Sequence, residues 1–284
     1  MWISGSGKLA SSPPTNRIHG VKKMRLPTLF PAALAAAGLA ALTVAGPAQT
    51  VVHQAAPAAI VEERAAGGSL VNDHLRIYTA GVDFSRPVGV VVRLHGDGAY
   101  EFHHPEYLLD GLAQTAARHN MILVAPLTPD VADGSTWWRD SAANAQWLAG
   151  TLESQVLGAY DVDRSDVWWM GYSGGAELLS RELIPRHPGL VSGGAVMLGG
   201  GGAPHGVAPA EWEAARQQVG PLTWLTGAED DGSDPASGFF DALTASRAGA
   251  ALYREKGFTV QEHHPEGVGH FGLDHAGILD AALS

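Results

Sequence analysis

The sequence contains no cysteine and is poor in basic residues, with 18 Lys and Arg against 29 Asp and Glu and a formal net charge of −11 over 284 residues. The absence of cysteine excludes disulfides and lipid attachment at a thiol, so a hydrophobic core alone must hold the fold. Five of the basic residues and none of the acidic ones precede residue 46, which leaves the remainder still more acidic. Such a surface repels nucleic acid and anionic lipid, and we expect neither as a partner.

The first 45 residues have the pattern of an export signal. Basic residues at 22–25 precede an uncharged run from Leu26 to Ala45 that is mostly Ala and Leu, and small residues follow at Gly46 and Ala48. This is the order of regions in a secretory signal peptide, with cleavage after Ala45 or Ala48. We therefore expect a secreted protein, with a signal peptide over 1–45 and a linker or poorly ordered segment over 46–69. Met24 is an alternative start, which would make residues 1–23 an N-terminal extension.

An uncleaved membrane anchor is the alternative for this segment, because the apolar run is about 20 residues long. Pro27, Pro31 and Gly38 interrupt it, and Ala outnumbers Leu and Ile. Such a composition inserts weakly into a bilayer. We expect no stable membrane association once the signal is cleaved.

Strand-like and helix-like segments alternate through the remaining chain, which we expect to form one catalytic domain over 70–284. The segment Val88–Leu94 is apolar at nearly every position, as a parallel strand covered on both faces is. The alternation predicts an α/β fold with a mostly parallel central sheet, helices on both faces and no large cap domain. The expected strands are 59–63, 75–80, 88–94, 121–126, 167–170, 191–198, 222–226 and 258–263, and the expected helices are 105–119, 142–160, 174–186, 208–218, 239–256 and 271–282.

The segment from Asp166 to Leu179 predicts a strand, a sharp turn and a helix. Within it Gly171, Ser173 and Gly175 match the G-x-S-x-G nucleophile elbow, in which a serine projects from a strained turn above the sheet edge. The neighbours must be glycine, because a Cβ would collide with the strand or helix that the turn brings together. In a chain with 36 glycines the motif can also arise by chance, so the rest of the sequence must decide.

Acidic residues follow the predicted strand 222–226, where a serine triad in the order Ser, acid, His needs its acid. Asp230 is the expected triad acid, with Asp231 as the second choice and Asp234 as the third. A solvated acidic loop is the alternative for this run. The position of the run in the predicted topology favours the catalytic interpretation.

The triad base is expected after the last strand, in the segment Gly267–Phe271. We expect His270 to be this base, because it alone lies between the strand end and the helix start, and the flanking glycines let the loop reach the elbow. His263, His264 and His275 are competing candidates. In such a triad the histidine takes the serine proton, while the aspartate holds the imidazole in the required tautomer.

An oxyanion hole needs two backbone N–H groups aimed at one point. Gly174, directly after the nucleophile, is expected to provide one of them. The turn His95-Gly96-Asp97-Gly98 follows a predicted strand at the position of the second donor, which is Asp97 or Gly98.

Aromatic residues near these loops are candidates for substrate contact. Trp137 and Trp138 lie in a loop at the carboxyl ends of the predicted strands, where binding and packing are equally expected, and Tyr172 precedes the nucleophile. Trp168 and Trp169 fall inside a predicted core strand, which favours packing. The paired histidines at 103–104 and 263–264 lack cysteine or carboxylate partners at zinc spacing, so we expect no metal site.

Three segments together resemble the α/β-hydrolase family over residues 70–284: Leu94-His95-Gly96, Tyr160-Asp161-Val162-Asp163 and Ser173-Gly174-Gly175. Within that family the chain is similar to secreted esterases grouped with polyhydroxybutyrate depolymerases and feruloyl esterases. The resemblance implies hydrolysis of a small or polymeric carboxylic ester through an acyl-serine intermediate, without a cofactor. That group often has cysteines and an Asn after the nucleophile, where this chain has Gly174.

Three other functions remain open at this point. A serine peptidase of the prolyl-oligopeptidase type uses the same triad, but it normally needs an additional domain or a charged patch for the peptide terminus. An acyltransferase would pass the acyl group to a sugar rather than to water. A non-catalytic binding protein on the same scaffold would not use the serine as a nucleophile.

Overall fold

The computed structural model describes residues 61–65, 74–132 and 134–284. The predicted signal peptide, Met24 and most of the predicted linker lie outside these residues. Within them, none of the helices is both long enough and apolar enough to cross a membrane.

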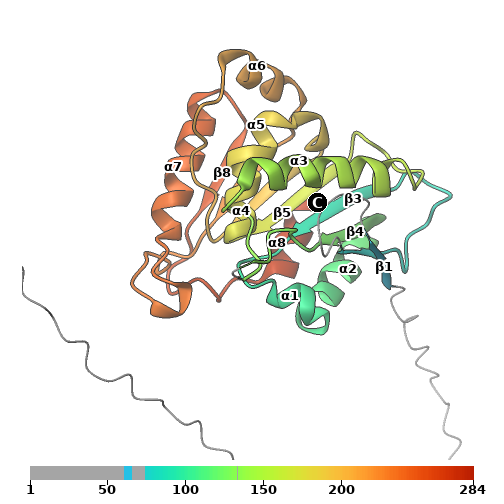
Figure 1. Ribbon diagram of the computed structural model, residues 1–284, viewed down its shortest axis with the longest axis horizontal. Helices are drawn as coiled ribbons and strands as arrows, with labels where there is room; N and C mark the ends of the chain where they lie inside the picture. Colours follow the sequence, from blue (N-terminus) through green and yellow to red (C-terminus); the bar gives the residue numbers. More distant parts are fainter. Residues whose placement is uncertain (1–60, 66–73, 133) are drawn as a thin grey trace, which may run out of the picture. The chain divides into compact units, whose positions relative to one another are not determined.

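The described residues form an eight-stranded sheet in the order β1-β2-β4-β3-β5-β6-β7-β8 (Figure 1). β1 pairs antiparallel with β2 and β2 antiparallel with β4, whereas the remaining pairs are parallel. The prediction of a mostly parallel sheet is therefore confirmed. The strands are β1 (Val61–Ala65), β2 (His74–Tyr78), β3 (Gly89–Leu94), β4 (Met121–Pro126), β5 (Val167–Tyr172), β6 (Gly194–Leu198), β7 (Leu222–Leu225) and β8 (Val260–His263).

Strand β1 overlaps the expected strand 59–63 and lies inside the segment 46–69 that we expected to be a linker or poorly ordered. Val61 pairs with Tyr78 and Ala65 with His74, so the strands that correspond to the expected segments 59–63 and 75–80 pair antiparallel. β1 is an edge strand and carries three charged residues at 62–64. Edge strands use charged side chains to avoid further pairing, which makes their composition similar to that of a linker.

The helices occupy the predicted connections, with shifted boundaries. α1 was not predicted, and the predicted helix 105–119 divides into a 3₁₀ turn at Pro105–Tyr107 and α2. The predicted helix 174–186 is continuous, because a π-helical stretch at Leu179–Leu183 joins α4 to α5. The helices are α1 (Tyr100–His103), α2 (Leu109–Arg118), α3 (Ser141–Leu152), α4 (Gly174–Leu178), α5 (Ile184–Arg186), α6 (Pro209–Gln218), α7 (Ala242–Glu255) and α8 (His275–Leu283).

Aspartates set the starts of the last two helices. Asp241 accepts a hydrogen bond from the amide of Thr244 and begins α7, and Asp274 accepts one from Gly277 and begins α8. Both helices therefore start a few residues later than hydrophobic periodicity predicted, because the capping side chain ends the preceding loop. The delayed start of α8 leaves His270 in the loop that precedes it.

Two hydrophobic clusters cover the two faces of the sheet. One contains buried residues of α3, of the helix 174–186 and of α7, and α3 crosses over β3 and β5 in Figure 1. The other contains residues of α2 and α8. Alternate positions of β3 divide between them, with Val90 and Val92 in the first cluster and Val91 in the second. Arg93 is two residues after Val91, so its side chain lies on the same face of the sheet, where it contacts His275 of α8.

Candidate active site

The turn after β5 has the geometry of the predicted nucleophile elbow. Ser173 has φ 50° and ψ −118°, a strained conformation that a non-glycine residue rarely adopts. A Cβ added to Gly171 would come within 2.5 Å of the carbonyl oxygen of Gly175. A Cβ added to Gly175 would come within 2.7 Å of the carbonyl oxygens of Leu94 and His95. The two glycines are therefore required by the close approach of strand, turn and helix.

Ser173, His270 and Asp230 form a hydrogen-bonded chain, although they are far apart in the sequence. His270 Nε2 lies 3.0 Å from Ser173 Oγ, and His270 Nδ1 lies 2.8 Å from Asp230 Oδ2. Both His270 and Asp230 are buried, at 5% and 3% exposure. With Nδ1–H donating to the carboxylate, Nε2 is free to accept the serine proton, which is the tautomer that general-base catalysis requires.

The competing acids have other roles. Asp231 is exposed, and its Oδ1 accepts a hydrogen bond from the amide of Ser233. Asp234 caps the 3₁₀ turn that follows, accepting from the amide of Ala236. Asp230 is therefore the residue of this acidic run that contacts His270.

The competing histidines are also placed elsewhere. His264 hydrogen-bonds with the Thr226 carbonyl and with Glu262. His263 ends β8, and His275 begins α8 beside Arg93. Burial together with the neighbouring Arg93 and His270 lowers the pKa of His275 to about 3, so it is neutral at ordinary pH.

The loop after β3 lies over the nucleophile, and two of its amides already have acceptors. A Cβ on Gly96 would come within 3.5 Å of the Cβ of Ser173. The Gly96 amide donates to Glu101 Oε1 at 3.0 Å, and the Gly98 amide donates to the Ser135 carbonyl at 2.8 Å. The expectation that Gly98 could supply the oxyanion hole is therefore wrong, because its N–H already donates to the Ser135 carbonyl.

The amide of Asp97 meets no acceptor among the described residues, so of the two expected donors in this loop its N–H is the one without a protein acceptor. Gly174 is the first residue of α4, so its N–H has no partner within the helix. The structure also brings these two residues together, since a Cβ on Gly174 would clash with Asp97 Oδ1.

His95 is buried beneath this loop and has a structural role. Its Nε2 accepts the Thr128 amide at 3.1 Å, which requires Nδ1 to carry the proton that is donated to the Gly96 carbonyl at 2.7 Å. Burial lowers the pKa of His95 to about 4, against a smaller opposing effect of the Gly96 carbonyl. A neutral imidazole thus fixes the backbone beside Asp97.

The three predicted substrate-contacting aromatics differ in their positions. Trp137 has 0% exposure, and its Nε1 donates to the His95 carbonyl at 3.0 Å, so its predicted role in substrate binding is wrong. Trp138 is 55% exposed and lines the cavity described below. Adjacent residues of a loop point in opposite directions, which sequence alone could not resolve. Tyr172 lines the cavity and also supports His270, since its hydroxyl donates to the His270 carbonyl at 3.0 Å.

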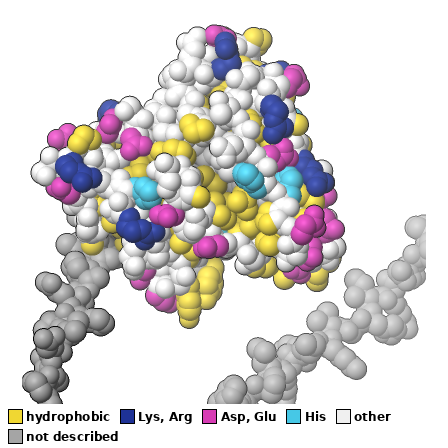
Figure 2. Space-filling view, turned by 180° about the vertical axis from the view of Figure 1, so that it is seen from behind, with side chains coloured by type: hydrophobic (Ala, Val, Ile, Leu, Met, Phe, Trp, Pro, Cys, Tyr) yellow, Lys and Arg dark blue, Asp and Glu magenta, His cyan; other side chains and the backbone are white. Residues whose placement is uncertain are grey.

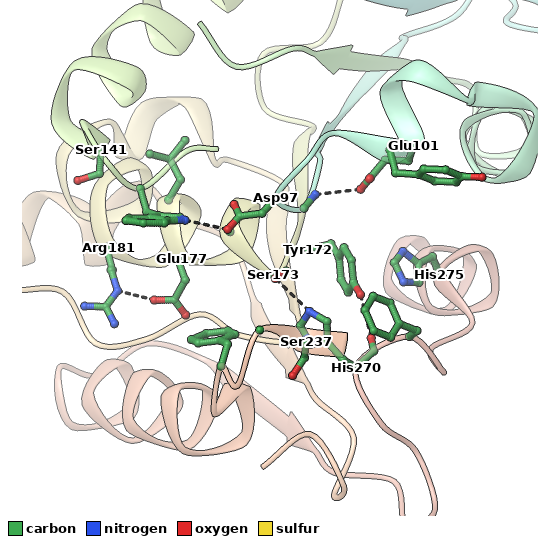
Figure 3. A pocket seen from close by; sticks show the side chains of 18 of the residues that line it. Asp97, Glu101, Ser141, Tyr172, Ser173, Glu177, Arg181, Ser237, His270 and His275 are labelled. Carbon is green, nitrogen blue, oxygen red and sulfur yellow. Dashed lines mark hydrogen bonds and ion pairs between the residues drawn. The ribbon is translucent and has the colours of Figure 1, made fainter. Parts of the chain in front are cut away.

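A cavity of about 950 Å³ opens around Ser173. Figure 3 shows Glu177 and Arg181 on one side of Ser173, and Tyr172 and His275 on the other. Trp138 lines the cavity and donates from Nε1 to Asp97. Hydrophobic side chains gather around a hollow in the face seen in Figure 2. The residues that line the cavity include the aromatic residues Tyr100, Tyr107, Trp138, Tyr172, Phe240 and Phe271 and the polar residues Asp97, Glu101, Ser141, Glu177, Arg181, Glu182 and His205.

Sequence reasoning missed a buried ionic group that supports the site. Arg93 has 1% exposure, and its Nη2 lies 3.2 Å from Glu101 Oε1 and 3.0 Å from His275 Nδ1. Glu101 holds the Gly96 amide, and the guanidinium of Arg93 lies 5.6 Å from the centre of the Tyr172 ring. The signal in the sequence was an arginine inside an otherwise apolar strand.

Glu177 was missed as well, and it holds the loop after β6. Its Oε1 accepts the amides of Gly201 and Gly202 at 2.8 and 3.0 Å, and its Oε2 pairs with Arg181 at 2.5 Å. A glutamate that follows a nucleophile elbow by one helical turn has no distinctive sequence pattern. Among the described residues, no group of three or more His, Cys, Asp or Glu side chains could hold a metal ion.

No protein-family model matches this chain, and no curated protein matches it. Solved structures do match. A feruloyl esterase module from Clostridium thermocellum, complexed with sinapinate, is 14% identical with a TM-score of 0.51, over 79% of this chain and 86% of that one. A carboxylesterase from Bacillus cereus is 18% identical with a TM-score of 0.51, over 75% and 92%. A ferulic acid esterase from Anaeromyces mucronatus in complex with ferulic acid is 14% identical with a TM-score of 0.53, over 80% and 90%.

These likenesses and the strand order define the fold. The chain has the α/β-hydrolase fold, as the sequence predicted.

Proposed function

We propose that this chain is a serine esterase that hydrolyses carboxylic esters through an acyl-serine intermediate. The observation that carries the proposal is the hydrogen-bonded chain from Asp230 through His270 to Ser173, which ends in a cavity. The similarity in fold to feruloyl esterases and to a carboxylesterase supports it.

In the first half-reaction Ser173 Oγ attacks the acyl carbon while His270 Nε2 takes its proton. Asp230 stabilises the imidazolium that forms, and the amides of Gly174 and Asp97 hold the oxyanion. The ester C–O bond then breaks, and the alcohol leaves with the proton from His270. In the second half-reaction His270 deprotonates a water that attacks the acyl-serine, and the carboxylic acid is released with Ser173 regenerated.

The cavity favours an ester with an aromatic or otherwise carbon-rich group. Tyr100, Tyr107 and Phe271 line it and are 59%, 72% and 65% exposed. Exposed aromatic side chains at a cavity mouth gain free energy when a ligand covers them. A feruloyl ester and a short polyester are therefore the first two substrates to compare, next to p-nitrophenyl acetate and butyrate.

The test uses the purified full chain, a fluorophosphonate probe and Ser173→Ala as the control. We expect the probe to label Ser173 and the esters to be turned over, with both lost in Ser173→Ala while its melting temperature changes little. Parallel assays with a peptide anilide, and product analysis with added trehalose or glucose, separate an esterase from a peptidase and from an acyltransferase. An unlabelled, inactive wild-type chain that melts cooperatively would refute the proposal.

We also propose that the protein is exported. This rests on the basic residues at 22–25 and the uncharged run 26–45. Expression of the full chain in a secreting bacterial host, followed by mass spectrometry of the protein in the medium, should find an N-terminus at Gly46 or Gln49. Retention of the intact leader inside the cells would contradict export.

A further inference from the structure

The charges that line the cavity are almost completely paired. Four carboxylates line it, and three of them each contact an arginine. These pairs are Glu101–Arg93 at 3.2 Å, Glu177–Arg181 at 2.5 Å and Glu182–Arg186 at 2.9 Å. Asp97 is the fourth carboxylate, and no cationic group among the described residues pairs with it.

Asp97 is held by neutral donors. Its Oδ1 accepts from Thr136 Oγ1 and its Oδ2 accepts from Trp138 Nε1, both at 2.8 Å. These two bonds fix the orientation of the carboxylate without neutralising its charge, and each oxygen can accept a further hydrogen bond. The side chain is exposed to the cavity and lies against Gly174, the residue that follows the nucleophile (Figure 3).

A fixed negative charge at this place opposes the reaction of a neutral ester. The oxyanion that forms at the amides of Gly174 and Asp97 is itself negative, and like charges at short range repel. A substrate that carries a positive charge near the scissile bond would remove this repulsion and would also be attracted to the carboxylate.

Trp138 adds a second element that favours a cation. Its indole is 55% exposed, lines the same cavity and is fixed through Nε1 to Asp97. An aromatic face beside a carboxylate is suited to ammonium groups, including quaternary ones, because the ring quadrupole attracts the cation. Resting on the function proposed above, we propose that the natural ester carries an ammonium group that binds in the cavity against the carboxylate of Asp97 and the exposed face of the Trp138 ring.

The experiment compares cationic esters with uncharged esters of the same shape. Choline acetate and 3,3-dimethylbutyl acetate place the charge on the alcohol side, whereas betaine ethyl ester and ethyl 3,3-dimethylbutyrate place it on the acyl side. For at least one pair, the ratio of kcat/KM for the cationic ester to kcat/KM for the uncharged ester should be about tenfold higher in the wild type than in Asp97→Asn. This difference between the two proteins should shrink at high salt, because salt screens the charge of the carboxylate. Asp97→Asn should also gain activity on the neutral esters.

Glu106→Gln is the matched control, because it removes one exposed carboxylate from the same region outside the cavity. Its ratio of kcat/KM for the cationic ester to kcat/KM for the neutral ester should equal that of the wild type.

Tetramethylammonium should also inhibit the wild type competitively at lower concentration than tert-butyl alcohol, a measurement that does not depend on the folding of Asp97→Asn. Equal ratios in wild type and Asp97→Asn for both pairs, or equal inhibition by the two compounds, would overturn the inference. With neutral esters still turned over, either result leaves the esterase proposal intact, whereas an inactive, unlabelled chain would refute that proposal instead.

Discussion

Exchange of Asp230 for asparagine is the sharpest test of the catalytic assignment, because a neighbouring aspartate provides a matched control. Asp230 Oδ2 lies 2.8 Å from His270 Nδ1, and the side chain is 3% exposed. Asparagine has the same shape but no charge, and its NH₂ group facing the ring would force the proton onto Nε2. Nε2, the nitrogen that faces Ser173, would then have no lone pair to accept the serine proton.

The expected loss follows from this change of tautomer and from the lost charge on a buried imidazolium. In serine hydrolases with this arrangement the same exchange lowers kcat by about 10⁴-fold. This corresponds to about 5.5 kcal/mol of transition-state stabilisation at 25 °C. We expect a decrease of about 10³- to 10⁴-fold here, with little change in KM for a soluble ester, because Asp230 does not line the cavity.

Asp231→Asn is the control. Asp231 is exposed and only accepts the Ser233 amide, so its exchange should change kcat less than about threefold. Steady-state rates on p-nitrophenyl butyrate, with melting temperatures of both variants, make the comparison. Equal losses in the two variants, or a larger loss in Asp231→Asn, would refute the assignment of Asp230.

Two further variants probe the residues that support the site. Tyr172→Phe removes the hydroxyl that donates to the His270 carbonyl at 3.0 Å, a bond worth about 1 kcal/mol. Its kcat should fall several-fold on both neutral and cationic esters, and an unchanged kcat would show that the loop needs no such support. His95 has a pKa lowered by burial to about 4, so between about pH 4 and the unfolded value of 6.5 only the unfolded chain binds the proton. The stability due to neutral His95 is thus complete above about pH 6.5 and is lost as the pH falls toward 4, at up to about 1.4 kcal/mol per pH unit. Urea unfolding at pH 5 and pH 7 should give a smaller pH difference in His95→Gln than in the wild type, and equal differences would exclude His95 as the titrating group.

Much of the fold, and the proximity of Ser173, His270 and Asp230, could be predicted from the sequence because backbone constraints determine them. Gly171 and Gly175 are required by close backbone contacts, and the alternation of strands and helices allowed few topologies. In that topology the loops after β7 and β8 meet at the sheet edge that carries Ser173. Asp230 and His270 could therefore be selected by position, although several acids and histidines competed.

The errors at the site concern the direction of single groups within loops. Trp137 and Trp138 are identical neighbours, and only tertiary packing makes the first a buried residue and the second a wall of the cavity. The amide of Gly98 has a sequence position that suits an oxyanion donor, but in the structure it donates to the Ser135 carbonyl. A contact to a loop far along the chain has no local sequence signal, so these positions required coordinates.

Arg93 explains why the loop after β3 and the loop that carries His270 keep fixed positions relative to each other at Ser173. A buried guanidinium is costly unless it is paired, and removal of one partner of such a pair is more costly still. Here the partners are Glu101, which holds the backbone beside Asp97, and the Tyr172 ring, whose hydroxyl holds the loop of His270. One charge in strand β3 thus fixes the proposed oxyanion donor and the proposed base relative to each other. An apolar residue at this position would pack well in the core, so an arginine there indicates a role in positioning the site rather than in stability alone.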